Sequence, residues 1–295
     1  MKHDRSSRTA EYMALFRALE RCQPPALRLF DDPFAASLLS GLLARAAAVA
    51  RIPYLGRLVP RLIDLGWPLT RSSGVLRTRL IDDAVEQSIA RGARQLLLLG
   101  AGFDSRGHRL DGLSPNTPTP VRVFEVDHPA TQRTKRERLQ TSVPANVCYV
   151  AVDFERDDLS RRLLDSGYAP TLPTVAVWEG VISYLSSAAV DHTFALLGQL
   201  LAPDSRLIFT YVDRRALDGS GSFSEAARWR GWVKLSGEPF LFGFLPDELP
   251  HYLEERGFTL SLDESTSETA RRYGPARSRK EPGSQLYRVA IADRT

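Results

Sequence analysis

Five short apolar runs, each followed by an acidic residue or a glycine, constrain the fold of this chain most strongly. They are QLLLLGAG, VRVFEVD, VCYVAVD, TVAVWEG and RLIFTYVD, and they lie between residues 95 and 213. Runs of this length without polar alternation are typical of strands buried on both faces of a parallel sheet. Helical patterns lie between them, at 128–140, 159–167 and 187–203. The sequence therefore predicts a doubly wound α/β sheet, in which ligands bind beyond the carboxyl ends of the strands.

The C-terminal part departs from this alternation. PDELPHYLEERGF is a helical pattern closed by Gly257, and the strand patterns TLSLDEST and QLYRVAIAD follow it. No helical pattern separates these two strands, so we expect them to pair as an antiparallel hairpin. The predicted sheet then has seven strands and is mostly parallel.

Residues 1–92 carry helical patterns and are predicted to form an N-terminal helical cap. AEYMALFRALERC repeats apolar residues at intervals of three and four, and residues 31–50 open with Asp32 ahead of Pro33, a helix-start signal. A third helix is expected to stop at Gly92. We expect residues 93–295 to form the α/β domain, with an insertion at about 213–245.

Composition excludes several classes of protein. The 39 basic and 35 acidic residues are interleaved, so the net charge of +4 does not indicate a nucleic-acid partner. The apolar run AASLLSGLLA is too short to cross a bilayer. The first residues are polar and charged, and Cys22 and Cys148 are isolated thiols outside any disulfide or metal-binding pattern. We therefore expect a cytoplasmic protein with no membrane partner and no metal ion.

A glycine turn follows the first strand, in LLLLGAGFDSRGHRL. Gly100 and Gly102 allow a ligand to approach the backbone at the start of a helix. The dinucleotide fingerprint requires a third glycine at position 105, where this chain has Ser105. A plain tight turn capped by Asp104 therefore remains an alternative.

Acidic residues end the next three strands. Glu125 and Asp127 follow the turn by just over twenty residues, where one carboxylate can accept the hydroxyls of a ribose. Asp153 and Phe154 end the third strand, and Glu179 ends the fourth. A single such carboxylate is usually a surface cap. Acidic or glycine elements at four successive strand ends favour an adenosine-type ligand that carries positive charge and few phosphates.

These motifs together resemble the leucine carboxyl methyltransferase-like family. The resemblance rests on LRTRLIDD, LLLLGAGFDSRGHRL, FEVDHP, VAVDFE and WEGVISYL, and it extends from RALERCQPPALRLFDDPFA through the final strands. Members are class I methyltransferases that use S-adenosyl-L-methionine, and they include bacterial polyketide carboxyl methyltransferases of the tetracenomycin type. The resemblance implies the class I fold and this cofactor.

The resemblance also implies roles for individual residues. Arg77 matches the arginine that pairs with the methionine carboxylate, and Arg79 would assist it. Gly100 and Gly102 form the turn under the cofactor, and Asp127 matches the ribose carboxylate, with Glu125 as the weaker alternative. Asp153 and Phe154 match the adenine site. Glu179 matches the acid that faces the methionine part.

Glu179 and Tyr184 of the E-x-V-x-x-Y pattern are the implied catalytic residues. Arg17 would correspond to an N-terminal basic contact. A surface ion pair for Arg77 and core packing for Tyr184 are the structural alternatives.

The insertion at 213–245 departs from the eukaryotic members that modify a phosphatase, so we expect a small-molecule acceptor. Its aromatic residues either line a lid with an apolar pocket or pack the insertion onto the sheet; they are Trp229, Trp232, Phe240, Phe242 and Phe244. No histidine belongs to a recognisable base pairing, which favours a carboxylate acceptor over a hydroxyl. The predicted function is formation of a methyl ester on a polyketide-like natural product. The alternatives are hydroxyl O-methylation and non-catalytic binding of the cofactor. A nicotinamide oxidoreductase is disfavoured because this chain lacks the third glycine of the dinucleotide fingerprint.

Overall fold

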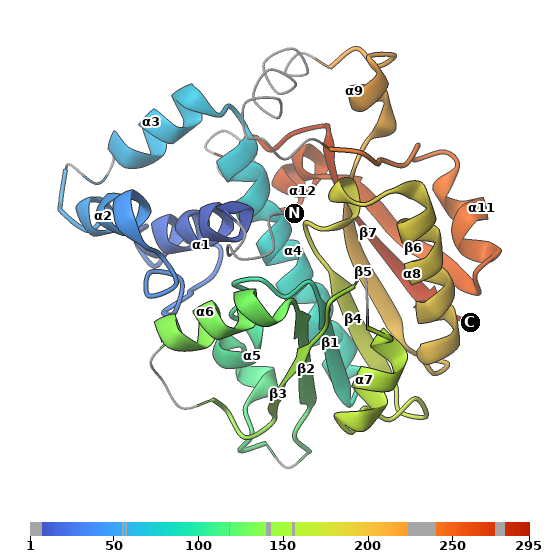
Figure 1. Ribbon diagram of the computed structural model, residues 1–295. Helices are drawn as coiled ribbons and strands as arrows, with labels where there is room; N and C mark the ends of the chain where they lie inside the picture. The colour runs from blue at the N-terminus through green and yellow to red at the C-terminus, as the bar shows by residue number, and fades with distance from the viewer. Residues whose placement is uncertain are drawn as a thin grey trace. The chain divides into compact units, whose positions relative to one another are not determined.

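The computed structural model describes residues 8–54, 56, 58–117, 119–139, 143–154, 157–223, 240–274 and 281–295. Its seven strands form one sheet in the order β3-β2-β1-β4-β5-β7-β6 (Figure 1). The strands are β1 Gln95–Leu99, β2 Arg122–Asp127, β3 Val147–Ala151, β4 Thr174–Trp178, β5 Arg206–Val212, β6 Phe258–Ser265 and β7 Tyr287–Arg294. β2 pairs with β3 and β4 pairs with β5 in parallel, whereas β7 is antiparallel to both β5 and β6. The predicted mostly parallel sheet with an antiparallel C-terminal pair is confirmed.

One detail of that C-terminal pair differs from the expectation. A helix, α12 Thr266–Arg272, stands between β6 and β7, so the two strands are not joined by a simple hairpin turn. Ser265 accepts the N–H of Glu268, whose side chain accepts the N–H of Ser265 in return. This reciprocal capping box starts a helix directly at the end of β6.

The chain divides into two compact units, Met1–Gly66 with Leu97–Tyr168 and Trp67–Leu96 with Ala169–Thr295. The helices of unit 1 are α1 Arg8–Arg21, α2 Gly41–Ala50, α3 Leu58–Gly66, α5 Arg106–Arg109, the 3₁₀ helix η2 Asp111–Leu113, α6 Pro129–Leu139 and α7 Leu159–Asp165. Those of unit 2 are α4 Thr70–Ala90, the 3₁₀ helix η3 Ile182–Tyr184, α8 Ser187–Leu200, α9 Arg214–Asp218, α11 Leu249–Glu254 and α12. The predicted domain boundary near residue 92 stays a prediction.

The helix expected from Asp32 begins later. Residues 33–38 form turns, and α2 starts only at Gly41, whose φ of 52° is left-handed. Asp32 does accept the N–H groups of Phe34 and Ala35. Its other carboxylate oxygen, however, bonds to Arg17 on α1. The side chain therefore fixes a loop against α1, although locally it has the sequence signature of a helix cap.

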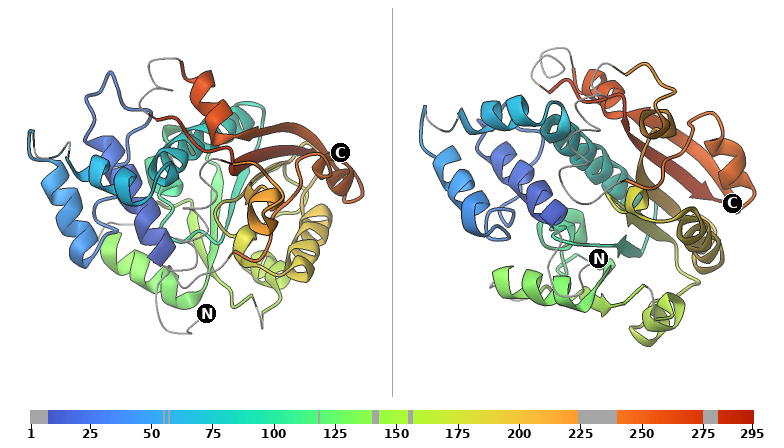
Figure 2. Two further views of the ribbon diagram at one scale, coloured as in Figure 1. Left: turned by 90° about the horizontal axis from the view of Figure 1, so that it is seen from above. Right: turned by 45° about the horizontal axis from the view of Figure 1, so that its top comes forward.

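Each unit has its own apolar packing. In unit 1, α1 contributes Ala14, Leu15, Ala18 and Leu19 to a buried cluster that also includes residues of α2 and Phe103. In unit 2, α4 packs against β4 and β5, and its end before Gly92 is as expected. Figure 2 shows α2 lying along the outer side of α1. No helix in the described ranges combines the length and the apolarity that a membrane span requires.

Candidate functional site

The glycine turn after β1 is tied to the end of β2 by backbone hydrogen bonds. Gly100 and Gly102 have φ values of 64° and 49°, which favour glycine. Ala101 donates its N–H to the carbonyl of Val126, and Gly102 donates its N–H to Oδ2 of Asp127. A Cβ at Gly102 would also lie 3.3 Å from the Cβ of Ala10. The turn therefore needs glycine at 102 for conformation and for space.

Asp127 closes β2 with a carboxylate that is held by backbone groups. Its second oxygen accepts the N–H of His128 at 2.6 Å, and the residue is partly exposed. Burial raises the pKa of Asp127 above its ordinary value, against the effect of the two backbone hydrogen bonds. A carboxylate has about four acceptor positions, and Gly102, His128 and the Thr131 side chain account for three of them. Asp127 is thus placed to accept a further hydroxyl group.

Glu125 lies two residues earlier on β2 and has a different environment. It is 1% exposed, and its Oε2 lies 2.5 Å from Nζ of Lys135 on α6. The carboxylate belongs to a buried ion pair in unit 1. This placement favours Asp127 over Glu125 as the ribose carboxylate that we propose.

The end of β3 carries the two residues expected at the adenine. β3 ends at Ala151, and the N–H of Asp153 donates to Oδ2 of Asp157. Phe154 is 52% exposed. An exposed ring beside a strand-end carboxylate is suitable for packing against a base.

In unit 2, Arg77 of α4 forms an ion pair with Glu179, which follows β4. Arg77 Nε lies 2.8 Å from Glu179 Oε1, and the two side chains are only 11% and 18% exposed. Gly180 has a φ of 70° and donates its N–H to Oγ1 of Thr210. A Cβ at Gly180 would lie 3.4 Å from Nη2 of Arg77. The strand end is thus shaped around the guanidinium.

Arg79, two residues along α4, has other partners. Its Nη2 lies 2.8 Å from Asp83 Oδ1, and its guanidinium is 5.9 Å from the ring centre of Tyr273. Arg79 therefore serves as an internal comparison for Arg77 on the same helix.

Tyr184 ends the 3₁₀ helix η3 and contacts the far end of the insertion. Its ring meets that of Phe240 edge to face, with centroids 4.9 Å apart. The carbonyl of Ser183 accepts the N–H of Leu241 at 2.7 Å. Phe244 is 5% exposed and packs against Tyr211, so this aromatic belongs to the core of unit 2.

Much of the predicted lid lies outside the described residues. Residues 224–239, which include Trp229 and Trp232, are not described. The lid therefore stays a prediction.

A buried ionic cluster in unit 1 was not predicted from the sequence. Asp32 is fully buried and accepts from Arg17 Nε at 2.8 Å and from Ser105 Oγ at 2.6 Å. Arg17 also donates to the carbonyl of Phe103 in the turn. Burial alone raises the pKa of Asp32, but Arg17, Arg109 and the Ser105 hydroxyl together bring it below its ordinary value. Arg17, expected as a cofactor contact, thus braces the glycine turn, and no single-sequence signal distinguishes these two roles.

A family model for leucine carboxyl methyltransferase matches residues 10–198, more than half of the chain. The chain belongs to the leucine carboxyl methyltransferase family. Two curated relatives are provisionally named as S-adenosyl-L-methionine-dependent methyltransferases. The one from Mycolicibacterium gilvum (strain PYR-GCK) is 30% identical over 287 residues, which cover 91% of this chain and 89% of the relative. The one from Frankia alni (strain DSM 45986 / CECT 9034 / ACN14a) is 35% identical over 234 residues, 75% of each chain.

Solved structures support the same fold. A DUF574 family protein from Streptomyces avermitilis MA-4680 superposes with a TM-score of 0.59 at 15% identity, over 98% of both chains. A protein from Thermobifida fusca YX, provisionally described as a methyltransferase, gives a TM-score of 0.61 at 18% identity, over 92% of this chain and 98% of that one. The expected class I methyltransferase fold is confirmed. This family member is an S-adenosyl-L-methionine-dependent methyltransferase, and S-adenosyl-L-methionine is its cofactor.

The residues of each unit suit parts of this cofactor. In unit 2, the guanidinium of Arg77 complements a carboxylate, and the neighbouring carboxylate of Glu179 complements an ammonium group. Such a pair suits the zwitterionic head of methionine. In unit 1, the carboxylate of Asp127 beside the glycine turn suits a ribose hydroxyl. In the described part of the chain, no cluster of three or more His, Cys, Asp or Glu side chains is arranged to hold a metal ion.

Proposed function

We propose that this methyltransferase forms a methyl ester on the carboxylate of a small, polyketide-like natural product. When bound, S-adenosyl-L-methionine supplies an electrophilic methyl group on a sulfonium centre. An ionised carboxylate accepts that group directly, one C–O bond forms as one C–S bond breaks, and no proton has to be removed. The opposite charges of sulfonium and carboxylate disappear together, so a dry site favours the reaction.

Residues of both units take specific parts in this proposal. Arg77 and Glu179 hold the two charged groups of the methionine head, and Asp127 accepts the ribose hydroxyls. Asp153 and Phe154 bind the adenine by its amine and its ring face. Positioning of the reacting groups supplies much of the rate in an in-line displacement.

Tyr184 is proposed as the residue that contacts the acceptor. It follows Glu179 by five residues and packs edge-on against Phe240, at the end of the insertion. The two rings form an edge-to-face contact in unit 2, and in this proposal they exclude water from the reacting groups.

The surroundings of the described histidines favour a carboxylate over a hydroxyl group as the methyl acceptor. His192 is exposed, and His251 is 81% exposed beside Glu255. His128 Nδ1 accepts the N–H of Ala130 at the start of α6. His108 is buried, and burial together with Lys135 lowers its pKa to about 4. Within unit 2, neither His192 nor His251 forms a hydrogen bond with Glu179 or Tyr184 among the described residues, whereas a hydroxyl acceptor needs a positioned base.

Labelled methyl transfer tests the proposal. The purified enzyme is incubated with methyl-labelled S-adenosyl-L-methionine and an extract of its host, and labelled products are identified by mass spectrometry. A methyl ester releases labelled methanol on mild alkaline treatment. A labelled product that is stable to base would reject carboxyl methylation and favour a hydroxyl acceptor.

A further inference from the structure

The N-terminal part of unit 1 exposes an unusual concentration of large apolar side chains. Of the thirteen large hydrophobic residues exposed in the described chain, seven lie between residues 42 and 65. They are Leu42 (77%), Val49 (40%), Ile52 (46%), Tyr54 (86%), Leu58 (49%), Leu62 (68%) and Leu65 (81%). Scattered exposed hydrophobic residues are normal, whereas these seven are concentrated in one segment of 24 residues, as in an interaction surface. We call these seven residues the α2–α3 apolar surface.

Helix α3 has apolar residues on two faces. Val59 and Ile63 pack against the buried cluster of unit 1. Leu58, Leu62 and Leu65 follow spacings of four and three, so they share another face, and all three are exposed. A surface helix of a soluble domain normally has polar residues on its outer face. The outer face of α3 therefore has an apolar character that the packing of unit 1 does not explain.

Positive charge surrounds this surface. Arg45, Arg51 and Arg61 are exposed on or directly after the same helices. Residues 41–66 contain four arginines and one acidic residue, Asp64, which is partly buried. Exposed leucines with arginines on a short helical segment are typical of segments that lie in the interface of an anionic membrane.

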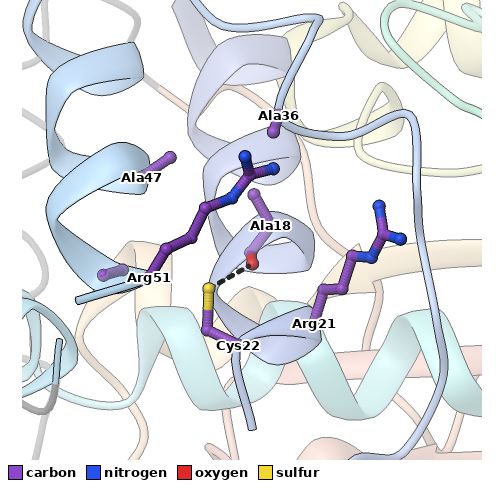
Figure 3. Close-up of a pocket in the computed structure, with 7 residues that line it drawn as sticks. Ala18, Arg21, Cys22, Ala36, Ala47 and Arg51 are labelled. Atoms are coloured by element: carbon purple, nitrogen blue, oxygen red, sulfur yellow. Dashed lines mark hydrogen bonds between the residues drawn. The ribbon is translucent and has the colours of Figure 1, made fainter. Parts of the chain in front are cut away.

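A hollow between α1 and α2 is lined by Arg51 and by one further arginine, Arg21. Figure 3 shows that Arg21 and Arg51 line it together with the small side chains Ala18 and Ala47. Its volume of about 480 Å³ exceeds that of a phosphate group. Arg21 also pairs with Asp31 at 3.2 Å, but both side chains are substantially exposed, so that pair is weak. The hollow can thus accept the phosphate of a lipid headgroup.

We propose that α2, α3 and the exposed residues 51–54 that follow α2 bind the surface of an anionic phospholipid membrane. The leucines enter the boundary between headgroups and acyl chains, and the arginines contact lipid phosphates. Tyr54 is strongly exposed after α2, and aromatic side chains are favoured at a membrane interface. This binding is peripheral and needs neither the acceptor nor the methyl transfer proposed above.

Charge also argues against a second copy of this chain as the occupant. In a two-fold symmetric contact the same patch meets itself, so the arginines of one copy, Arg45, Arg51 and Arg61, would be brought close to the same set of arginines on the other. Like charges at close range oppose such a contact. An anionic lipid surface instead neutralises each of these arginines.

Sedimentation with vesicles tests the proposal on the full chain. The protein is mixed with vesicles of phosphatidylcholine alone or of phosphatidylcholine with phosphatidylglycerol, at low and high salt. We expect binding to the anionic vesicles, weaker binding to the neutral ones, and a loss of binding as salt screens the charges.

Paired variants locate the surface. Leu62→Ser with Leu65→Ser should weaken vesicle binding by about tenfold or more, because both side chains lose apolar contact. Arg45→Gln with Arg61→Gln should weaken it by about fivefold for each arginine removed. The matched controls are Leu164→Ser with Leu172→Ser and Arg161→Gln, which remove exposed groups elsewhere and should leave binding unchanged. Circular dichroism shows that each variant is folded.

Three results would overturn the proposal. Equal binding by the leucine variant and its control would place any membrane contact elsewhere. If the protein did not bind vesicles but formed a dimer, and if Leu62→Ser with Leu65→Ser dissociated that dimer, the surface would be assigned to a second copy of the chain. Absence of vesicle binding with a raised KM for the methyl acceptor in the same variant would assign it to the acceptor. The vesicle assay contains no acceptor, so its outcome is separate from that of the labelled methyl transfer.

Discussion

Asp127 at the end of β2 accepts the backbone N–H of Gly102, and this hydrogen bond joins a strand end to the glycine turn after β1. Glu125, two residues earlier on the same strand, bonds instead to Lys135 on α6. The two carboxylates of the FEVD motif therefore have separate tasks in unit 1. One is held by backbone groups at a strand end, and the other neutralises a buried lysine.

Asp127→Ala should weaken binding of S-adenosyl-L-methionine by about 2–3 kcal/mol, because ribose hydroxyls lose a charged acceptor. Glu125→Ala should affect binding much less but should lower the free energy of unfolding by about 3–5 kcal/mol, because it leaves the charge of Lys135 buried without a partner. Calorimetric titration and chemical denaturation measure the two effects. Equal binding losses, or the reverse order, would reject Asp127 as the specific ribose carboxylate.

Arg77→Ala should raise the dissociation constants of S-adenosyl-L-methionine and of its demethylated product by the same factor. Both molecules carry the same methionine carboxylate, so the variant removes uniform binding. The factor should exceed about tenfold, as expected for a hydrogen bond to a charged group. Arg79→Ala is the control, since Arg79 pairs with Asp83 on the same helix. If adenosine binding fell equally, Arg77 would not be the group that holds the carboxylate.

Asp32→Asn should lower the free energy of unfolding by about 3–5 kcal/mol, because Arg17 keeps its charge while its buried partner becomes neutral. Asp31→Asn is the adjacent control. Asp31 forms exposed ion pairs with Arg21 and Arg28, so its loss should cost at most about 1 kcal/mol. If the free energies of unfolding of the two variants differed by less than 1 kcal/mol, Asp32 would not be the residue that stabilises the loop.

The effect of Asp32 should also depend on pH. The pKa of Asp32 is lower in the folded chain than its ordinary value of 3.8, so its stabilising effect is present above that value. As pH falls below about 4 through the lowered pKa, the carboxylate is protonated and the effect is lost. Denaturation of the wild type and of Asp32→Asn should therefore give a stability difference that is constant near neutral pH and shrinks in acid. A difference that stays constant into acid would contradict the assigned direction.

The sequence predicted the sheet because its signal is local: each buried strand is a short apolar run between glycines and acids. Positions of some elements depend on distant partners. Asp32 before Pro33 has the local form of a helix cap, but its bond to Arg17 holds it in a loop. The helix after β6 was detectable, since Ser265 and Glu268 form a capping box.

The site residues also divide into those with a local sequence signal and those that depend on distant partners. The acids at strand ends were predicted from their positions, whereas the choice between Asp127 and Glu125 depends on Lys135 on another element. The absence of a membrane partner was expected from the lack of a long apolar run. An interfacial surface leaves no such run, because alternate faces of a short helix such as α3 are indistinguishable until packing shows which one is buried.

The final prediction concerns catalysis by histidine. An acceptor carboxylate with an ordinary pKa near ~4 is already ionised at neutral pH, so its methylation needs no general base. Replacing His108, His128, His192 or His251 singly by glutamine should therefore lower kcat by less than about tenfold, below the usual range of about 10²–10⁴ for base catalysis. His108 provides the strictest case, because its lowered pKa keeps it neutral above about pH 4 and its side chain is buried beside Glu125. The rate is measured by labelled methyl transfer at saturating cofactor, with Tyr184→Phe as a comparison that alters the proposed acceptor contact. A histidine variant that loses about a thousandfold in kcat, within the general-base range, would require proton removal from the acceptor and would move the reaction to a hydroxyl group.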